Sequence, residues 1–254
     1  MLKKILSKIT LARISLAIFN LWSLPEKIYN RKVLNTYRDV SKPDICKPFK
    51  KHICVLFCYR NYDHIVESFN SLYRKETDYF IVENYSENSH KIREFFLTKK
   101  IKGYIQFKNN ISNNAFGIFL MDFYNLLKEY EYITLSDCDL LITDKDAIFS
   151  EIFKNLDFKD VLISCADFDM KNLPNVPGSE HWIFPSIDTG DYLEGFTGIW
   201  LLTLKNENLN FFYNVKSHDG AWQFKTKSLG KKWVKTRVNK AYHITWDLYH
   251  EENE

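Results

Sequence analysis

The sequence predicts an α/β domain built on a mostly parallel sheet flanked by helices, with an amphipathic helix in front of it. Strand-like and helix-like segments alternate along residues 52–143, the strand-like segments are almost continuously apolar, and polar side chains follow each of them. Parallel strands are buried on both faces, which explains the continuous apolar runs. Their alternation with helices is typical of a doubly wound sheet, whose strand ends open into one crevice.

Composition places the chain among packed globular proteins. Its 254 residues suffice for one large domain, or for one domain with appendages. A hydrophobic content of 45% and an aromatic content of 16% exclude disorder. The five cysteines form no Cys-x-x-Cys pair, so we expect the reduced, buried thiols of a cytosolic protein and no zinc site.

Residues 1–51 form a basic arm. They hold twelve Lys or Arg and three acidic residues, a net charge of +9 in a chain whose total is +3. Arg13 interrupts the apolar run, which argues against a signal peptide or a membrane span. We expect a helix lying on an anionic membrane surface, with Trp22 among the headgroups and no role in nucleic-acid binding. The alternative is a helix docked on protein. In either case the apolar stripe of the helix comprises Leu2, Ile5, Ile9, Ala12, Leu16 and Phe19.

Beyond residue 23 the chain divides into a linker, which is still part of the basic arm, and a folded body. Residues 24–51 contain three prolines and read as the linker, so the predicted domain covers residues 52–254. We expect this domain to consist of two halves, residues 52–143 and residues 144–254. The elements of the first half are strands at 52–58, 78–82, 104–107 and 132–135 and helices at 65–72, 89–97 and 116–128.

Two carboxylates follow the strand at 132–135. Asp137 and Asp139 are one residue apart, at the end of a strand that faces the crevice. They repel each other, so a divalent cation, hydrogen-bond donors or solvent must neutralise them. Mg²⁺ and Mn²⁺ are hard ions that take one or two carboxylates together with water and phosphate oxygens. An Asp-x-Asp pair also occurs in solvated surface turns, which is the alternative here.

An ordered set of motifs resembles the glycosyltransferases of the GT-A fold, in particular the family 2 type. The resemblance covers about residues 52–245 and departs from the usual pattern at Glu83, where Asp is usual, and at His218, where Glu is usual. The matching segments are Tyr59-Arg60-Asn61, Val82-Glu83-Asn84-Tyr85-Ser86, residues 109–117, Ser136-Asp137-Cys138-Asp139, residues 195–202 and residues 218–224.

The resemblance implies that residues 52–143 bind a nucleoside-diphosphate sugar donor with Mn²⁺ or Mg²⁺, and that residues 144–254 bind the acceptor. Asp139 would hold the metal, and Asp137 would lie near both the ribose and the metal. His243, near the end of the chain, would be a further metal ligand. The alternatives are a solvated loop acid at Glu83 and a structural histidine at His243. The residues implied to face the nucleotide sugar are Tyr59, Arg60, Glu83, Asn84, Asn109 and Asp137.

Transfer to a hydroxyl also needs a general base. Asp219 is the candidate from the motif at 218–224, and Glu194 and Asp191, in the loop at 188–195, are rivals. Asp219 could instead cap the helix expected to begin near Ala221.

The predicted protein is a metal-dependent, inverting glycosyltransferase. It would act on a glycan or a lipid-linked saccharide at the inner face of the cytoplasmic membrane. One alternative is a sugar nucleotidyltransferase, although residues 58–63 have no glycine to cradle a triphosphate. The other is a non-catalytic, membrane-tethered glycan-binding protein of the same fold.

Overall fold

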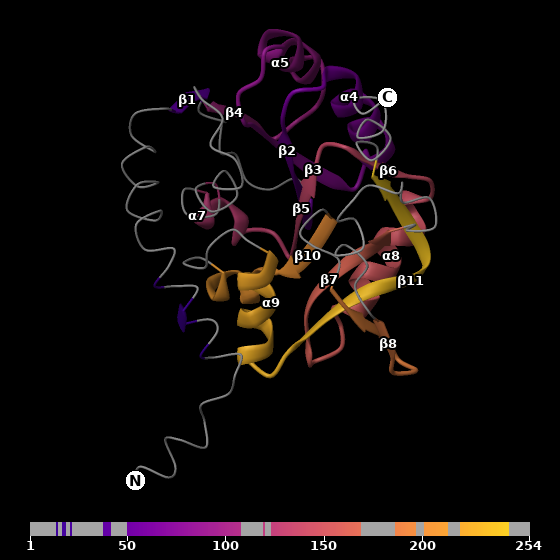
Figure 1. The fold of residues 1–254 in the computed structure, drawn as a ribbon. Helices are drawn as coiled ribbons and strands as arrows, with labels where there is room; N and C mark the ends of the chain where they lie inside the picture. The colour runs from indigo at the N-terminus through magenta and orange to yellow at the C-terminus, as the bar shows by residue number, and fades with distance from the viewer. Residues whose placement is uncertain are drawn as a thin grey trace, which may run out of the picture.

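The computed structural model describes residues 50–107, 123–168, 186–196, 201–212 and 219–243, together with the strand Arg38–Ser41 and the single residues Ile14, Ala17, Ile18, Leu21 and Phe119. These residues form one large mixed sheet with helices on both faces (Figure 1). Along the sheet the strands follow the order β1-β4-β3-β2-β5-β10-β7-β11-β9-β8, and β6 pairs with β11 off this path.

The first half of the sheet agrees closely with the sequence prediction. Strand β2 and helix α5 have the predicted bounds, whereas β5 continues past Leu135 to include Ser136 and Asp137. Of the helix expected at 116–128, Phe119 and α7 lie within the described residues. The elements are β2 (His52–Cys58), α4 (Tyr62–Leu72), β3 (Thr77–Glu83), α5 (Ser89–Leu97), β4 (Gly103–Phe107), α7 (Tyr124–Leu127), β5 (Tyr132–Asp137) and β6 (Leu140–Ile142).

The second half is less parallel than predicted. Strand β10 lies between β5 and β7 and is antiparallel to both, whereas β11 is parallel to β7. A hairpin of β8 and β9 replaces the loop expected at 188–195. Helix α9 begins at Asp219, two residues before Ala221. The elements are α8 (Lys145–Asn155), β7 (Val161–Phe168), β8 (Ser186–Asp188), β9 (Leu193–Gly195), β10 (Leu201–Lys205), η3 (Asn206–Phe211), α9 (Asp219–Ser228) and β11 (Lys232–His243).

The predicted linker contributes a strand. β1 (Arg38–Ser41) pairs antiparallel with β4 and forms one edge of the sheet. Within the arm, Ile14, Ala17, Ile18 and Leu21 are helical and exposed, and the predicted stripe from Leu2 to Phe19 lies outside the described residues. Among the described residues, no helix is both long enough and apolar enough to cross a membrane.

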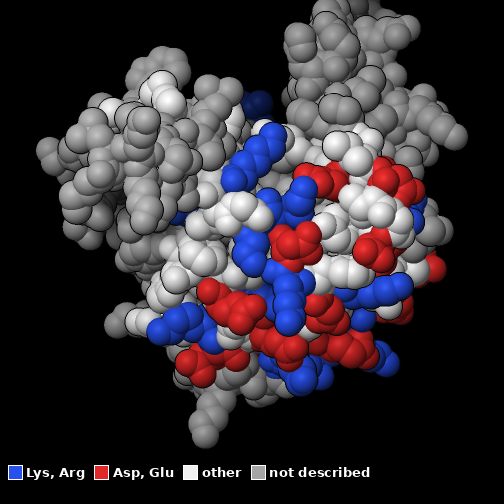
Figure 2. Space-filling view, turned by 90° about the horizontal axis from the view of Figure 1, so that it is seen from below, with Lys and Arg blue, Asp and Glu red and all other residues white. Residues whose placement is uncertain are grey.

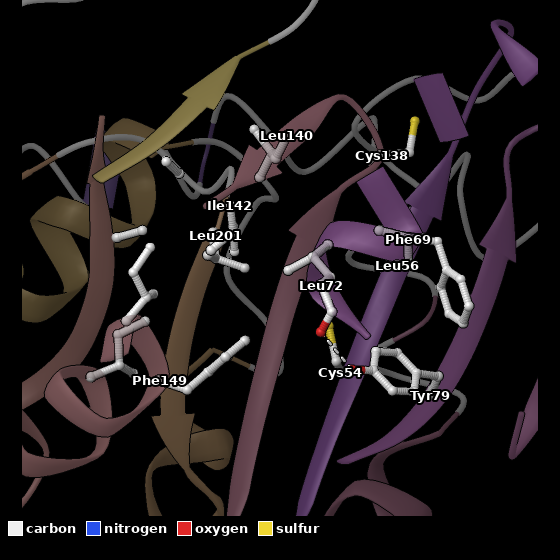
Figure 3. Close-up of a cluster of buried hydrophobic side chains, with 14 of the residues drawn as sticks. Cys54, Leu56, Phe69, Leu72, Tyr79, Cys138, Leu140, Ile142, Phe149 and Leu201 are labelled. Carbon is white, nitrogen blue, oxygen red and sulfur yellow. Dashed lines mark hydrogen bonds between the residues drawn. The ribbon is translucent and has the colours of Figure 1, made fainter. Parts of the chain in front are cut away.

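Alternating side chains give the sheet two apolar faces. On one face, α4 and α5 cover β2 and β3 and α8 lies against β7 and β11, and Figure 3 shows Phe69 and Leu72 of α4 beside Leu56. The Tyr79 hydroxyl of β3 donates a hydrogen bond of 2.8 Å to the Leu72 carbonyl, which fastens α4 to the sheet. The opposite face packs against α7, η3 and α9, with Trp222 of α9 fully buried there.

Opposite charges are mixed on the underside of the molecule. Figure 2 shows Lys and Arg interspersed with Asp and Glu over the described surface seen from below. Where β5 and β7 begin, Lys205 lies 3.0 Å from Asp157 and Lys232 lies 2.7 Å from Glu194. Because neighbouring charges of opposite sign cancel, the described part of this face has no strong field of one sign.

Candidate functional site

The carboxyl ends of β2, β3 and β5 meet at one rim of the sheet. Cys58 lies opposite Glu83, and Phe57 lies opposite Asp137, in parallel ladders. Hydrogen bonds also join the exits of these strands beyond the ladders. The Asn84 amide donates a hydrogen bond of 2.8 Å to the Cys58 carbonyl, and the Tyr59 amide donates one of 3.4 Å to the Cys138 sulfur. Three segments that the sequence singled out are therefore neighbours in space.

Two residues at this rim have a left-handed backbone without being glycine. Arg60, just after β2, has φ 62°, and Tyr85, just after β3, has φ 48°. Such a conformation costs an L-residue about 1–2 kcal/mol, and strain of this kind gathers at functional sites. Arg60 is exposed and stacks 4.9 Å above the Tyr59 ring, while Tyr85 is 47% exposed. Nothing in the sequence around Tyr85 indicated this conformation.

Glu83 is buried and holds the loop that follows β3. Its Oε1 accepts hydrogen bonds of 2.9 Å from the hydroxyls of both Ser86 and Ser89. Burial raises the pKa of Glu83, and the bonds from Ser86 and Ser89 partly offset this effect. The alternative of a solvated loop acid is therefore wrong, because the side chain has no solvent exposure. In this structure Glu83 shapes the loop, and it does not present its carboxylate to solvent.

Asp137 and Asp139 are partly exposed on either side of a buried Cys138. Cys138 is anchored to the exit of β2 through the Tyr59 backbone, which fixes the turn between the two acids. The pKa of the nearby Cys58 thiol is raised by burial first, then by Cys138, and further by the charges of Glu83 and Asp137. Glu83 and Asp137, at the ends of β3 and β5, therefore both lie near the Cys58 thiol.

These residues fit a divalent cation that shares its ligands with a phosphate. Within the described residues, no group of three or more His, Cys, Asp and Glu side chains could hold a metal. Mg²⁺ is commonly bound by one or two carboxylates plus substrate phosphates and water, and Asp137 and Asp139 provide such a pair. The backbone of His243 lies opposite Leu140, next to Asp139, because β6 pairs with β11. Its side chain is outside the described residues.

The candidate bases fall in different places. Asp219 is the first residue of α9, and its side chain lies outside the described residues. Glu194 lies on β9, four strands along the sheet from β5, and its carboxylate forms an ion pair with Lys232. Asp191 is exposed in the turn of the β8–β9 hairpin. The sheet order thus separates Glu194 and Asp191 from Asp137 and Asp139 at the end of β5.

The remaining predicted residues are only partly described. Tyr59 is half-buried, and Asn84 is buried against the exit of β2. Asn109 lies outside the described residues, as do His218 and residues 197–200.

Comparison with known proteins finds both related sequences and solved structures of similar fold. No family model matches it. It is 31% identical over 245 residues to an uncharacterized protein of Acanthamoeba polyphaga mimivirus, an alignment covering 87% of this chain and 49% of that protein. The chain thus spans about half the length of this relative.

Two solved structures share its fold. One is the mannosyltransferase PcManGT from Pyrobaculum calidifontis in complex with GDP-Man and Mn²⁺, with a TM-score of 0.55, 15% identity and coverage of 92% of this chain and 68% of that one. The other is residues 1–349 of S. aureus TarS, with a TM-score of 0.50, 15% identity and coverage of 79% and 62%. The chain has the GT-A fold of nucleotide-sugar glycosyltransferases, as its motifs predicted.

Proposed function

We propose that the chain is a glycosyltransferase that moves a sugar from a nucleoside-diphosphate sugar to a hydroxyl of a glycan or glycolipid. The observation that carries this proposal is the position of Asp137 and Asp139, at the end of β5 and beside the exits of β2 and β3, within a GT-A fold. In open α/β sheets such a rim is the ligand crevice.

The exits of β2 and β3 form the donor side of this proposal. Tyr59, Arg60 and Asn84 lie there, together with the exposed ring of Tyr85. Aromatic faces stack on nucleobases, and a guanidinium binds phosphate through two parallel hydrogen bonds. The hydrogen bonds of Glu83 to Ser86 and Ser89 keep the loop after β3 in the shape that presents these groups.

Asp139, with Asp137 and His243, would hold Mn²⁺ or Mg²⁺ at the donor diphosphate. Such an ion, when bound, neutralises the charge that develops on the leaving nucleoside diphosphate. The structure of PcManGT contains GDP-Man and Mn²⁺, which supports the choice of metal for a chain of the same fold.

Asp219 is the proposed base, and it takes the proton of the acceptor hydroxyl as that oxygen attacks the anomeric carbon. Asp219 is the first residue of helix α9, which leads directly into β11. One direct displacement by the acceptor inverts the configuration at the anomeric carbon.

The test is hydrolysis and transfer with a panel of nucleotide sugars, with and without Mn²⁺. We expect turnover in the wild type and at least a 100-fold loss in Asp139→Ala, because one of two metal-binding carboxylates is removed. Asp146→Asn is a matched control, since Asp146 is an exposed acid whose partner is Arg74, in the turn after α4. Its turnover should equal that of the wild type.

Three other outcomes would contradict the proposal. Unchanged turnover in Asp139→Ala would remove its metal-binding role. Formation of a nucleotide sugar from a sugar phosphate and a nucleoside triphosphate would indicate a nucleotidyltransferase. Saccharide binding without turnover would indicate a glycan-binding protein.

We propose in addition that the basic arm holds the protein on an anionic membrane surface at the cytoplasmic side. Ile14, Ile18 and Leu21 recur at helical spacing and are 46%, 57% and 71% exposed. At about 100° per residue they lie on the side of the helix opposite the stripe that the sequence predicts, so they form a second apolar surface on the same segment. Burial of these side chains and attraction of the basic residues to anionic lipid act in the same direction.

A further inference from the structure

An exposed aromatic side chain lies at the rim on a strained backbone. Tyr85 follows β3, has φ 48° and is 47% exposed, whereas its neighbours Asn84 and Ser86 are buried. Glycine adopts this left-handed conformation freely and asparagine tolerates it, but other L-residues are strained in it. A tyrosine at this position therefore works against the stability of the loop.

Hydrogen bonds on both sides hold Tyr85 in this conformation. Before it, the Asn84 amide donates a hydrogen bond of 2.8 Å to the Cys58 carbonyl of β2. After it, the Ser86 hydroxyl donates one of 2.9 Å to Glu83. The backbone cannot relax at Tyr85 without breaking these bonds, because the residues on either side are fixed. The loop would thus keep its shape with asparagine or glycine at position 85.

Burial does not explain why this residue is a tyrosine. Tyr79 and Tyr130 are buried, and their hydroxyls donate hydrogen bonds inside the fold. The ring of Tyr85 leaves nearly half of its surface in solvent, so it gains much less from the removal of apolar surface from water. Strain that packing does not offset is typical of functional positions.

The strand register indicates the form of a ligand that reaches this ring. Glu83 lies opposite Cys58, and Phe57 lies opposite Asp137, so β2 separates the exit of β3 from the aspartates. Two strand spacings amount to about 10 Å. A ligand that contacts both Tyr85 and a cation at Asp137 is elongated, with a flat apolar group at one end and an anionic group at the other. A nucleoside diphosphate has this form.

The loop after β3 presents a ring to this ligand and not a carboxylate. Along residues 81–86, Tyr85 is the exposed residue, whereas Glu83 is turned inward onto the hydroxyls of Ser86 and Ser89. The motif at 82–86 implied that Glu83 faces the nucleotide, but in the structure its carboxylate holds the loop. An aromatic ring binds a base through its π-face, which every base has.

We propose that the Tyr85 ring stacks on the nucleobase of the donor, so that the loop after β3 binds the base through its face. This inference rests on the proposed glycosyltransferase function. The strained backbone is retained for the sake of the ring, so the contributions of Tyr85 to ligand affinity and to stability have opposite signs. Loss of the ring should weaken binding of the nucleotide and strengthen the fold.

The experiment is isothermal titration calorimetry with ADP, GDP, UDP and CDP in the presence of Mn²⁺. Stacking of a base on an aromatic ring corresponds to a factor of about 5–100 in affinity. Tyr85→Asn should raise the Kd of each diphosphate that the wild type binds by that factor, and Tyr85→Gly should do the same. Tyr85→Phe retains the ring and should bind as the wild type does. Inorganic pyrophosphate with Mn²⁺ has no base, so its Kd should be equal in all four proteins.

Urea unfolding of the same proteins provides the second readout. The unfolding midpoint of Tyr85→Asn should be higher than that of the wild type, because asparagine tolerates the left-handed conformation. Leu97→Asn is the matched control, since it also removes an exposed apolar side chain. Leu97 is 69% exposed and is the last residue of α5, the helix that follows the loop. This variant should leave every Kd unchanged.

Three results would overturn the inference. An unchanged Kd of the diphosphates in Tyr85→Asn, with a lower unfolding midpoint, would show that the ring is structural. An equal loss of pyrophosphate binding would show that the ring acts on the phosphates or on the shape of the loop. If the wild type binds no nucleoside diphosphate, the proposed function fails together with the inference. Binding that Tyr85→Asn leaves intact would overturn the inference alone.

Discussion

At the scale of single residues, His52 shows how a titratable group becomes part of the core. It opens β2 and bridges the two neighbouring strands, with Nδ1 2.9 Å from the Thr77 hydroxyl and Nε2 2.7 Å from the Thr134 hydroxyl. Burial, aided by the positive charge of Arg74, lowers the pKa of His52 to about 3. The imidazole is therefore neutral in the folded protein across the physiological range.

His52 should make the fold sensitive to acid. Between pH 6.5, the usual pKa of an unfolded histidine, and about 3, the unfolded chain binds a proton that the folded chain does not. The free energy of unfolding should fall as the pH falls through this window, by up to about 1.4 kcal/mol per pH unit from this residue. Urea unfolding of the wild type and of His52→Gln from pH 7 to pH 4 measures it. The variant should show the shallower slope, and equal slopes would refute the assignment.

At the scale of elements, helix α8 supports the turn that carries the aspartates. It begins after Asp144, whose Oδ1 accepts a hydrogen bond of 3.0 Å from the Ala147 amide, and it packs Ile148, Phe149 and Ile152 against the sheet. This cap satisfies one of the free amides of the first turn. Strand β6 lies between Asp139 and this helix, so a well-anchored α8 limits the movement of the turn that carries Asp137 and Asp139.

Loss of the cap should cost stability without affecting chemistry. Asp144→Ala is expected to lower the free energy of unfolding by about 1 kcal/mol, whereas Asp144→Asn, which retains an acceptor oxygen, should cost much less. Urea titration measures both variants at neutral pH. Turnover per folded molecule should stay at the wild-type value, and a loss of turnover in Asp144→Ala would mean that α8 takes part in the site more directly than its contacts indicate.

At the scale of the whole molecule, a basic arm precedes a sheet in which charges of both signs alternate on the underside (Figure 2). The arm is also part of the fold, because β1 pairs with β4. Deletion of residues 1–51 would therefore expose the edge of β4. A loss of membrane binding in such a variant could then result from a damaged fold as well as from the missing anchor. Substitutions in the helical part of the arm avoid this difficulty.

Membrane binding should depend on both the charge and the apolar surface of the arm. Four basic residues near an anionic surface contribute about 1 kcal/mol each, or roughly 4 kcal/mol. The full chain should sediment with anionic vesicles at low salt and be released as salt screens the charges. Two sets of substitutions should each weaken this sedimentation. One replaces Lys3, Lys4, Lys8 and Arg13 by Gln, and the other replaces Ile14, Ile18 and Leu21 by Ser. If both variants sediment with vesicles as strongly as the wild type, the arm does not bind the membrane and is instead a helix that docks on protein.

Much of the candidate site could be predicted from local sequence. Asp137 and Asp139 follow an apolar strand, and the exits of β2 and β3 contain polar residues, so that a parallel sheet alone brings them to one rim. The burial of Glu83 could not be predicted, because it depends on Ser86 and Ser89 folding back over its carboxylate.

The sequence by itself determined strands β2, β3, β4 and β5 and helices α4 and α5 of the first half, because an apolar run that ends in polar residues shows which segment is buried. It did not predict β6. It could not determine that β10 lies between β5 and β7, or that β1 leaves the arm to pair with β4. These pairings join segments far apart in the chain, and their register depends on packing across the whole sheet and not on local periodicity. Lys235 of β11 lies 2.9 Å from Asp167 of β7 for the same reason, and only the tertiary structure shows it.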